Sequence, residues 1–203
     1  MRKAFLNCGA NKGNDILLFR EKYGKDYEIF AFEPEPRCYP HLDEIKAKGC
    51  EFNHVKAAIG GHDGKTWFYE GQHTVSGSLR QDKFTFMSGR RYEVPVINFS
   101  KWLLDNFQAG DEVICLFNIE GGEYEIFPSL FSSGACNLIS EFYCEMHAQK
   151  LKNFSQIENQ KWINKCIDTW GNKCYIYGEH QSDKFTQISS EFWNPNTAKI
   201  GKI

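Results

Sequence analysis

The sequence has no run that approaches the roughly 20 consecutive apolar residues of a membrane-spanning helix. Its start also lacks the cationic, apolar and small-residue regions of a secretory signal. The net charge is −2 and the lysines are scattered, so no basic patch of the kind that binds nucleic acid is present. These absences predict a cytoplasmic protein without a membrane span and do not favour a nucleic acid partner.

The eight cysteines form no C-x-x-C pair and show no spacing typical of a metal site. Cys8, Cys115, Cys144 and Cys174 lie in or beside apolar runs that predict strands. Cysteines in such positions are usually buried packing residues in a reducing compartment. We therefore expect free thiols in the core, and no metal site.

The first 60 residues alternate between short apolar runs and segments with helical spacing. Gly24 and Gly49 stand where helices should end, and a βαβαβ order of this kind predicts a parallel sheet in an α/β fold. The expected strands here are 3–7, 27–33 and 50–59, and the expected helices are 14–23 and 37–48.

The rest of the chain continues this alternation less regularly. Pro95 predicts that its extended segment, 94–99, lies at a sheet edge, because proline cannot donate to a neighbouring strand. Ser100 is the expected N-cap of the following helix. The expected strands are 66–70, 112–119 and 137–146, the expected helices are 100–107, 123–131 and 153–170, and 173–177 with 185–188 should form a closing antiparallel hairpin. We expect one domain over residues 1–190 and a C-terminal tail over 191–203.

A glycine turn and a later carboxylate predict a nucleoside pocket. Gly9 and Gly13 lie between the first strand and the first helix, and Glu33 follows about 20 residues later, the spacing at which dinucleotide-binding folds contact a ribose. The glycines are spaced G-x-x-x-G, so the G-x-G-x-x-G turn of NAD enzymes is absent, which disfavours an NAD-dependent oxidoreductase. The pattern fits a nucleoside ligand without a pyrophosphate, and S-adenosylmethionine is the commonest of these.

Three spaced motifs carry a resemblance to a known family. They are Asn7-Cys-Gly-Ala-Asn-Lys-Gly13, Ala31-Phe-Glu-Pro34 and Asn118-Ile-Glu-Gly-Gly-Glu123. The chain thereby resembles the FkbM-type S-adenosylmethionine-dependent methyltransferases. The resemblance implies a Rossmann-like class I methyltransferase fold, with a mostly parallel seven-stranded sheet, helices on both faces and a C-terminal antiparallel hairpin. It also implies O-methylation of a hydroxyl on a small molecule or glycan.

Asn7 and Asn118 stand where the family has aspartate. Each asparagine keeps one carbonyl acceptor but removes a charge that would attract a cationic ligand. The alternative is therefore a catalytically weakened cofactor-binding module that acts through a partner. A cover for the substrate should come from residues 72–91, from the tail or from another subunit of a possible homo-oligomer.

Eight residues are candidates for binding the cofactor. Gly9, Gly13 and Asn11 should lie beside the methionine half, although an ordinary turn explains them as well. Glu33 should accept hydrogen bonds from the ribose hydroxyls. Asn53 and Ala58, at the end of the third strand, should lie near the adenine, although the alanine also suits a core position. Asn7 and Asn118 complete the set.

The candidate catalytic residues follow the fourth and fifth strands. His147 is the expected general base, with Glu145 orienting it or acting in its place. Glu120 or Glu123 should position the acceptor, although Glu123 in the first turn of a helix is also explained by the helix dipole. His147 could equally be an ordinary surface histidine without a catalytic role. Methyl transfer by this scheme requires no metal.

Overall fold

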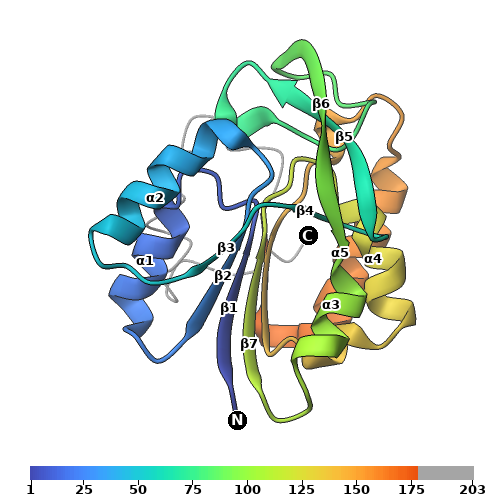
Figure 1. Ribbon diagram of the computed structural model, residues 1–203. Helices are drawn as coiled ribbons and strands as arrows, with labels where there is room; N and C mark the ends of the chain where they lie inside the picture. Colours follow the sequence, from blue (N-terminus) through green and yellow to red (C-terminus); the bar gives the residue numbers. More distant parts are fainter. Residues whose placement is uncertain (178–203) are drawn as a thin grey trace.

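The computed structural model describes residues 1–177, which form an α/β fold around a six-stranded parallel sheet (Figure 1). The strand order β3-β2-β1-β7-β8-β9 reverses direction between β1 and β7. In open α/β sheets this reversal opens a crevice at the carboxyl ends of the strands. The strands are β1 Lys3–Cys8, β2 Glu28–Phe32, β3 Asn53–Val55, β7 Glu112–Phe117, β8 Glu141–Glu145 and β9 Cys174–Tyr177.

Helices cover both faces of this sheet, as expected (Figure 1). Successive residues of β1 face opposite sides: Phe5 packs with Phe19 of α1, and Leu6 belongs to the core under α3 and α4. Burial on both faces explains why the central strands are continuous apolar runs. The helices are α1 Asn14–Tyr23, α2 Tyr39–Ala47, α3 Phe99–Asn106, α4 Glu123–Ser132 and α5 Gln156–Trp170; short 3-10 segments are Pro36–Cys38, Thr74–Ser76, Ala135–Leu138, Ala148–Lys150 and Gly171–Lys173.

A second sheet of three strands lies beside the first, in the order β4-β6-β5. Its strands are β4 Ala58–Gly60, β5 Gly64–Gly71 and β6 Met87–Asn98. The expectation of one strand over 50–59 is therefore wrong. The backbone amide of Ala57 donates to the carbonyl of Val55 at 2.8 Å, and this tight turn directs the chain from the large sheet into the small one.

Two local expectations in this region are also wrong. β6 is the central strand of its sheet, not an edge. Pro95 is tolerated because the parallel pairing of β4 with β6 begins at Ala58 and Val96, so Pro95 lies before the start of β4. The N-cap of α3 is Asn98, whose side chain accepts a hydrogen bond from the amide of Lys101 at 3.1 Å. Ser100 lies inside the helix.

The predicted closing hairpin is only partly visible. Its first arm is β9, which pairs in parallel with β8 through Phe142 and Cys174. The second arm at 185–188, and with it the seventh strand, the domain end at 190 and the tail, lie outside the described residues. No helix within residues 1–177 is both long and apolar enough to cross a membrane.

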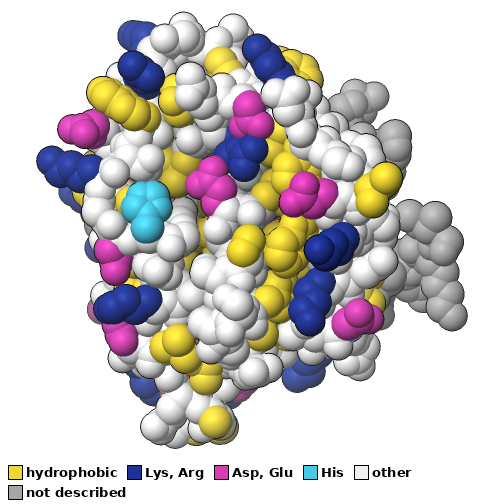
Figure 2. Space-filling view, turned by 90° about the vertical axis from the view of Figure 1, so that its right-hand side faces the viewer, with side chains coloured by type: hydrophobic (Ala, Val, Ile, Leu, Met, Phe, Trp, Pro, Cys, Tyr) yellow, Lys and Arg dark blue, Asp and Glu magenta, His cyan; other side chains and the backbone are white. Residues whose placement is uncertain are grey.

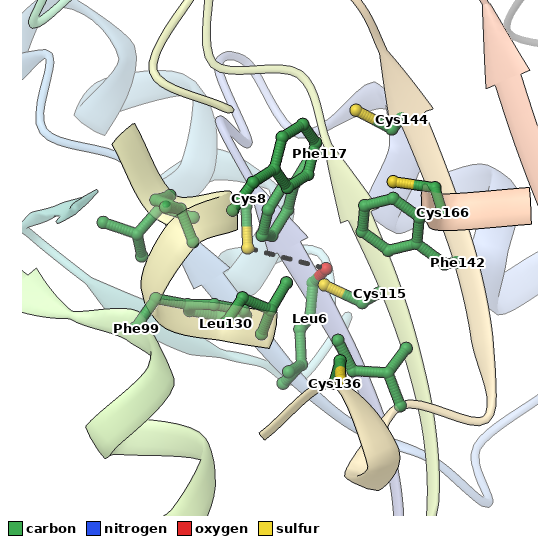
Figure 3. Packing of buried hydrophobic residues seen from close by; sticks show 14 of the residues in the cluster. Leu6, Cys8, Phe99, Cys115, Phe117, Leu130, Cys136, Phe142, Cys144 and Cys166 are labelled. Carbon is green, nitrogen blue, oxygen red and sulfur yellow. Dashed lines mark hydrogen bonds between the residues drawn. The ribbon is translucent and has the colours of Figure 1, made fainter. Parts of the chain in front are cut away.

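Most of the cysteines pack in one core with phenylalanines (Figure 3). Strand register places them at two successive levels, one running Cys8, Phe117 and Cys144 and the next running Leu6, Cys115, Phe142 and Cys174. All eight cysteines are free, as expected, and seven of them are buried. Burial raises the pKa of the Cys144 thiol well above its usual value, so the reactive thiolate is disfavoured.

One face of the molecule carries exposed hydrophobic side chains with acidic and basic groups interspersed around them (Figure 2). A groove lies between α4 and α5, lined by residues that include Phe131, Ile157 and Trp162. Ile157 is 84% exposed there.

Candidate functional site

A cavity of about 290 Å³ lies where the sheet order reverses, at the carboxyl ends of the central strands. Its walls come from the turns after β1, β2 and β7, from the last residue of β8, from β4 and β5 of the small sheet, and from the segment that follows β5. Its size and place are those of a small-molecule site in an open α/β fold. The lining residues used below are Gly9, Asn11, Lys12, Asp15, Glu33, Ala58, Ile59, Phe68, Thr74, Val75, Gly77, Ser78, Leu79, Asn118, Glu120 and Glu145.

The two glycines of the first turn are required by the packing of the protein itself. Gly9 has φ +87°, and a Cβ there would lie 2.0 Å from the carbonyl oxygen of Asn118. Gly13 has φ +84°, and a Cβ there would lie 2.6 Å from the side chain of Ile45 on α2. Gly9 lines the cavity, whereas Gly13 does not. These glycines bring the loop after β7 and the helix α2 close to the turn.

Glu33 is held rigidly at the cavity wall. Its Oε2 accepts a hydrogen bond from the amide of Asn11 at 2.6 Å, and its Oε1 accepts one from the amide of Glu35 at 2.7 Å. Burial raises the pKa of Glu33 to about 7, although both amide bonds favour the charged form. Each oxygen retains a second lone pair, so the carboxylate can still accept hydrogen bonds from a diol.

The two asparagines that replace the family's aspartates lie in different surroundings. Asn118 lines the cavity. Asn7 is fully buried outside the lining, and neither its amide nitrogen nor its oxygen has a partner within residues 1–177. Asn11 lines the cavity with φ +47°, and its side-chain oxygen lies 3.2 Å from the Cys38 thiol.

Of the two residues predicted near an adenine, one lies at the cavity. Ala58 is a buried lining residue on β4. Asn53 begins β3 instead of following it, is exposed, and donates a hydrogen bond to Glu28 at 2.9 Å. The expectation that Asn53 ends its strand is wrong, because β3 is only three residues long.

His147 is buried among three carboxylates and lies outside the cavity lining. Its Nδ1 lies 2.8 Å from Glu123, and its Nε2 lies 3.3 Å from both Glu120 and Glu145. Burial disfavours the charged imidazole, but the carboxylates of Glu123 and Glu120 outweigh it and raise the pKa of His147 well above its usual value. An imidazolium has no lone pair to accept a proton. The side chain is also fully buried and does not line the cavity.

The loop after β7 is held by ionic and hydrogen-bonding side chains. Glu123 accepts hydrogen bonds from the amides of Ile119 at 3.0 Å and Gly121 at 2.8 Å. Glu120 lines the cavity and lies 2.9 Å from the ammonium of Lys150 and 3.0 Å from that of Lys83. Burial would raise the pKa of Glu120, but His147 and the two lysines lower it well below its usual value.

Sequence reasoning missed Asp15 and Lys83. Asp15 lines the cavity from the first turn of α1, and burial together with the charge of Glu145 raises its pKa to about 6. An acidic residue in the first turn of a helix is usually explained by the helix dipole, so nothing in the sequence gives a reason to place Asp15 in a binding site. Lys83 lies 37 residues before its partner Glu120, and no local pattern marks it.

Within residues 1–177, no group of three or more His, Cys, Asp or Glu side chains is arranged to hold a metal ion.

Comparison with known proteins gives one family and one similar structure. The crystal structure of methyltransferase FkbM from Methylobacillus flagellatus KT aligns with 13% identity and a TM-score of 0.41, over 65% of this chain and 30% of that chain. The chain thus matches under a third of that protein's length. No curated protein matches. Residues 7–184 match the model of the methyltransferase FkbM domain. Because this match extends over most of the 203 residues, the chain belongs to the FkbM methyltransferase family.

Proposed function

We propose that this protein is an S-adenosylmethionine-dependent methyltransferase that methylates a hydroxyl oxygen of a small molecule or glycan. Family membership supports methyl transfer. The observation that carries the cofactor assignment is Glu33, whose carboxylate is held by two backbone amides at the wall of a nucleoside-sized cavity. A carboxylate at the end of the second strand is the group that accepts both hydroxyls of a ribose in nucleoside-binding α/β folds.

The residues around the cavity fit the parts of this cofactor. Glu33 would accept the ribose hydroxyls, and the turn around Asn11, together with Asn118, would hold the methionine half. Ala58 and Phe68 provide small and flat apolar walls for the adenine. Four carboxylates line the cavity with one lysine, Lys12, and two of them, Glu120 and Glu145, already lie beside cationic side chains. Asp15 and Glu33 are the lining carboxylates that would attract a cationic ligand when ionised.

The chain has two tasks once the cofactor supplies its activated methyl group. It must align an acceptor oxygen, and it must remove the proton of that hydroxyl. We propose that the carboxylate of Asp15 or Glu145 accepts this proton, because both side chains line the same cavity. The pKa of Asp15, about 6, is close to the range that suits a general base at neutral pH. His147 lies 3.3 Å from Glu145 and orients that carboxylate.

Calorimetric titration with S-adenosylmethionine, S-adenosylhomocysteine and NAD tests the cofactor assignment. We expect the two adenosyl ligands to bind, NAD not to bind, and Glu33→Ala to abolish binding. Glu28→Ala is the matched control, because Glu28 begins the same strand at its opposite end. Binding that persists in Glu33→Ala, or no binding to the unmodified protein, would contradict the proposal.

The acceptor assignment has its own test. Hydroxyl-bearing sugars and small alcohols are incubated with the protein and the labelled cofactor, and methyl ethers are identified by mass spectrometry. Asp15→Asn and Glu145→Gln should each lower turnover while leaving adenosylhomocysteine affinity within a few-fold. Products methylated on nitrogen or carbon instead would overturn O-methylation.

A further inference from the structure

The segment between β5 and β6, residues 72–86, forms one wall of the cavity; we call it the cover segment. It lies above the carboxyl ends of the central strands (Figure 1). Five of its residues line the cavity, namely Thr74, Val75, Gly77, Ser78 and Leu79. Two backbone hydrogen bonds between Ser78 and Tyr69, at 2.8 and 3.0 Å, attach it to β5.

Lys83 joins the two arms of this cover segment. Its side chain is fully buried, and its ammonium donates to the carbonyls of Ser76 at 2.6 Å and Thr85 at 3.2 Å. The same ammonium lies 3.0 Å from Oε2 of Glu120. The ammonium thus makes two hydrogen bonds to backbone carbonyls within the cover segment, a contact with the Met87 sulfur at 3.7 Å, and an ion pair with Glu120. The cover segment is thereby connected to a cavity residue on the loop after β7.

Glu120 makes a second connection through its main chain. The hydroxyl of Ser78 donates to the Glu120 carbonyl at 2.7 Å. Glu120 itself has φ +56°, a left-handed conformation that non-glycine residues avoid. Such strain persists only where surrounding contacts fix the backbone. The carboxylate contacts with Lys83, Lys150 and His147 are those contacts.

The far end of the cover segment is strained in the same way. Phe86 has φ +54°, and its carbonyl accepts hydrogen bonds from the amide of Gln72 at 2.7 Å and the hydroxyl of Ser76 at 3.2 Å. Phe86 as a whole residue is 62% exposed, so close packing of its side chain does not explain the strained backbone. Both strained residues therefore lie at points where the cover segment is tied down.

We propose that Lys83 is a positioning residue, which through Glu120 holds the cover segment closed over the cavity and limits the rate at which an adenosyl ligand leaves. The part of this proposal that concerns ligand release rests on the proposed function. The part that concerns the closed position of the cover segment does not depend on it. Opening separates a buried ion pair, and each charge is then left without its partner in a poorly solvated place.

The test compares Lys83→Met with Lys150→Met. Lys150 reaches the same Glu120 carboxylate at 2.9 Å from the segment after β8. Within residues 1–177, no side-chain hydrogen bond joins it to the cover segment, so Lys150→Met removes a charge from Glu120 without cutting that connection. Hydrogen exchange by mass spectrometry on the ligand-free protein reports the cover segment, and stopped-flow dissociation of S-adenosylhomocysteine reports release.

In Lys83→Met, amide exchange within 72–86 and ligand dissociation should each be at least about tenfold faster, because the variant loses the ion pair with Glu120 and both carbonyl hydrogen bonds. In Lys150→Met both should stay within about threefold of the unmodified protein. Equal exchange in the two variants would overturn the proposal. So would unchanged exchange in 72–86.

Two further outcomes remain interpretable. Fast exchange throughout Lys83→Met would mean that this variant is unfolded. In that case Glu120→Gln, which keeps the side-chain shape, should still accelerate exchange in 72–86. Unchanged exchange there in Glu120→Gln would overturn the proposal. If the unmodified protein binds no adenosyl ligand, the proposed function fails, while the exchange comparison still decides the role of Lys83.

Discussion

His147 Nδ1 lies 2.8 Å from Oε1 of Glu123, and that carboxylate accepts the backbone amides of Ile119 and Gly121. The imidazole thus contacts the group that shapes the loop bounding the cavity. His147→Ala should lower the free energy of unfolding by about 3–5 kcal/mol, because buried carboxylates lose their counter-charge. Urea unfolding measures the loss. A large fall in turnover with unchanged stability would instead return His147 to the role of base.

The charge of His147 also predicts how stability depends on pH. Its pKa is raised in the folded state, so its contribution is complete below the unfolded value of about 6.5 and is lost as pH rises toward the folded value. From this residue alone, stability should fall above pH 6.5 by up to about 1.4 kcal/mol per pH unit. His147→Asn retains a donor for Glu123 but no charge, so the difference between the two unfolding curves should shrink with pH. A constant difference would contradict a charged imidazole.

Gly9 and Gly49 offer a matched pair, because their φ angles are +87° and +89°. Nothing lies within 4 Å of a Cβ at Gly49, whereas at Gly9 the Asn118 carbonyl would be 2.0 Å away. Gly49→Ala should cost about 1–2 kcal/mol of stability from backbone strain alone. Gly9→Ala should cost about 1–3 kcal/mol more, because the loop after β7 must move. Equal losses in urea unfolding would show that the loop yields freely.

The affinity for adenosyl ligands should rise with pH around neutrality. The pKa of Glu33 is about 7, and only the ionised carboxylate presents acceptors on both oxygens. Calorimetry with S-adenosylhomocysteine between about pH 5.5 and 8.5 should show tighter binding as Glu33 ionises. In Asp15→Asn the affinity should still rise with pH. In Glu33→Gln the affinity should be roughly tenfold lower and should no longer depend on pH in this range. A pH dependence that persists in Glu33→Gln would assign it to another group.

Restoring aspartate should have opposite consequences at Asn7 and Asn118. Asn7 is fully buried without a hydrogen-bond partner in the described part of the chain. A carboxylate there would be desolvated, its pKa raised, and Asn7→Asp should lose stability progressively as pH rises above about 4. Asn118 lines the cavity, so Asn118→Asp should fold normally and bind the cationic cofactor more tightly. Thermal unfolding and calorimetry decide both.

The cysteines should be nearly silent toward thiol reagents. Seven of the eight are buried, and only Cys50 is partly exposed. Ellman's reagent should therefore label at most one thiol rapidly in the native protein, and all eight in guanidinium chloride. Cys50→Ser should remove the rapid phase. Rapid labelling of further thiols would mean that the core beside β7 opens readily.

The parts of the site that are local in sequence were predictable. The turn at Gly9, the start of α1 and the carboxylate of Glu33 follow from spacing along one β–turn–helix unit. What failed depends on distant partners. The division of 53–60 between two sheets is decided by neighbours elsewhere in the chain, as is the central position of β6. The burial of His147 could not be predicted, because its partners Glu120 and Glu123 come from another loop.

The cavity has walls from two separate sheets, with Phe32 and Leu116 from the large one and Ile59 and Phe68 from the small one. The turn that holds Glu33 belongs entirely to the large sheet. Substitutions or insertions in the hairpin of β5 and β6 can therefore reshape one side of the chamber while the carboxylate and its two amides stay in place. Under the proposed function, such changes would alter the acceptor side of the cavity and leave the part that holds the nucleoside intact.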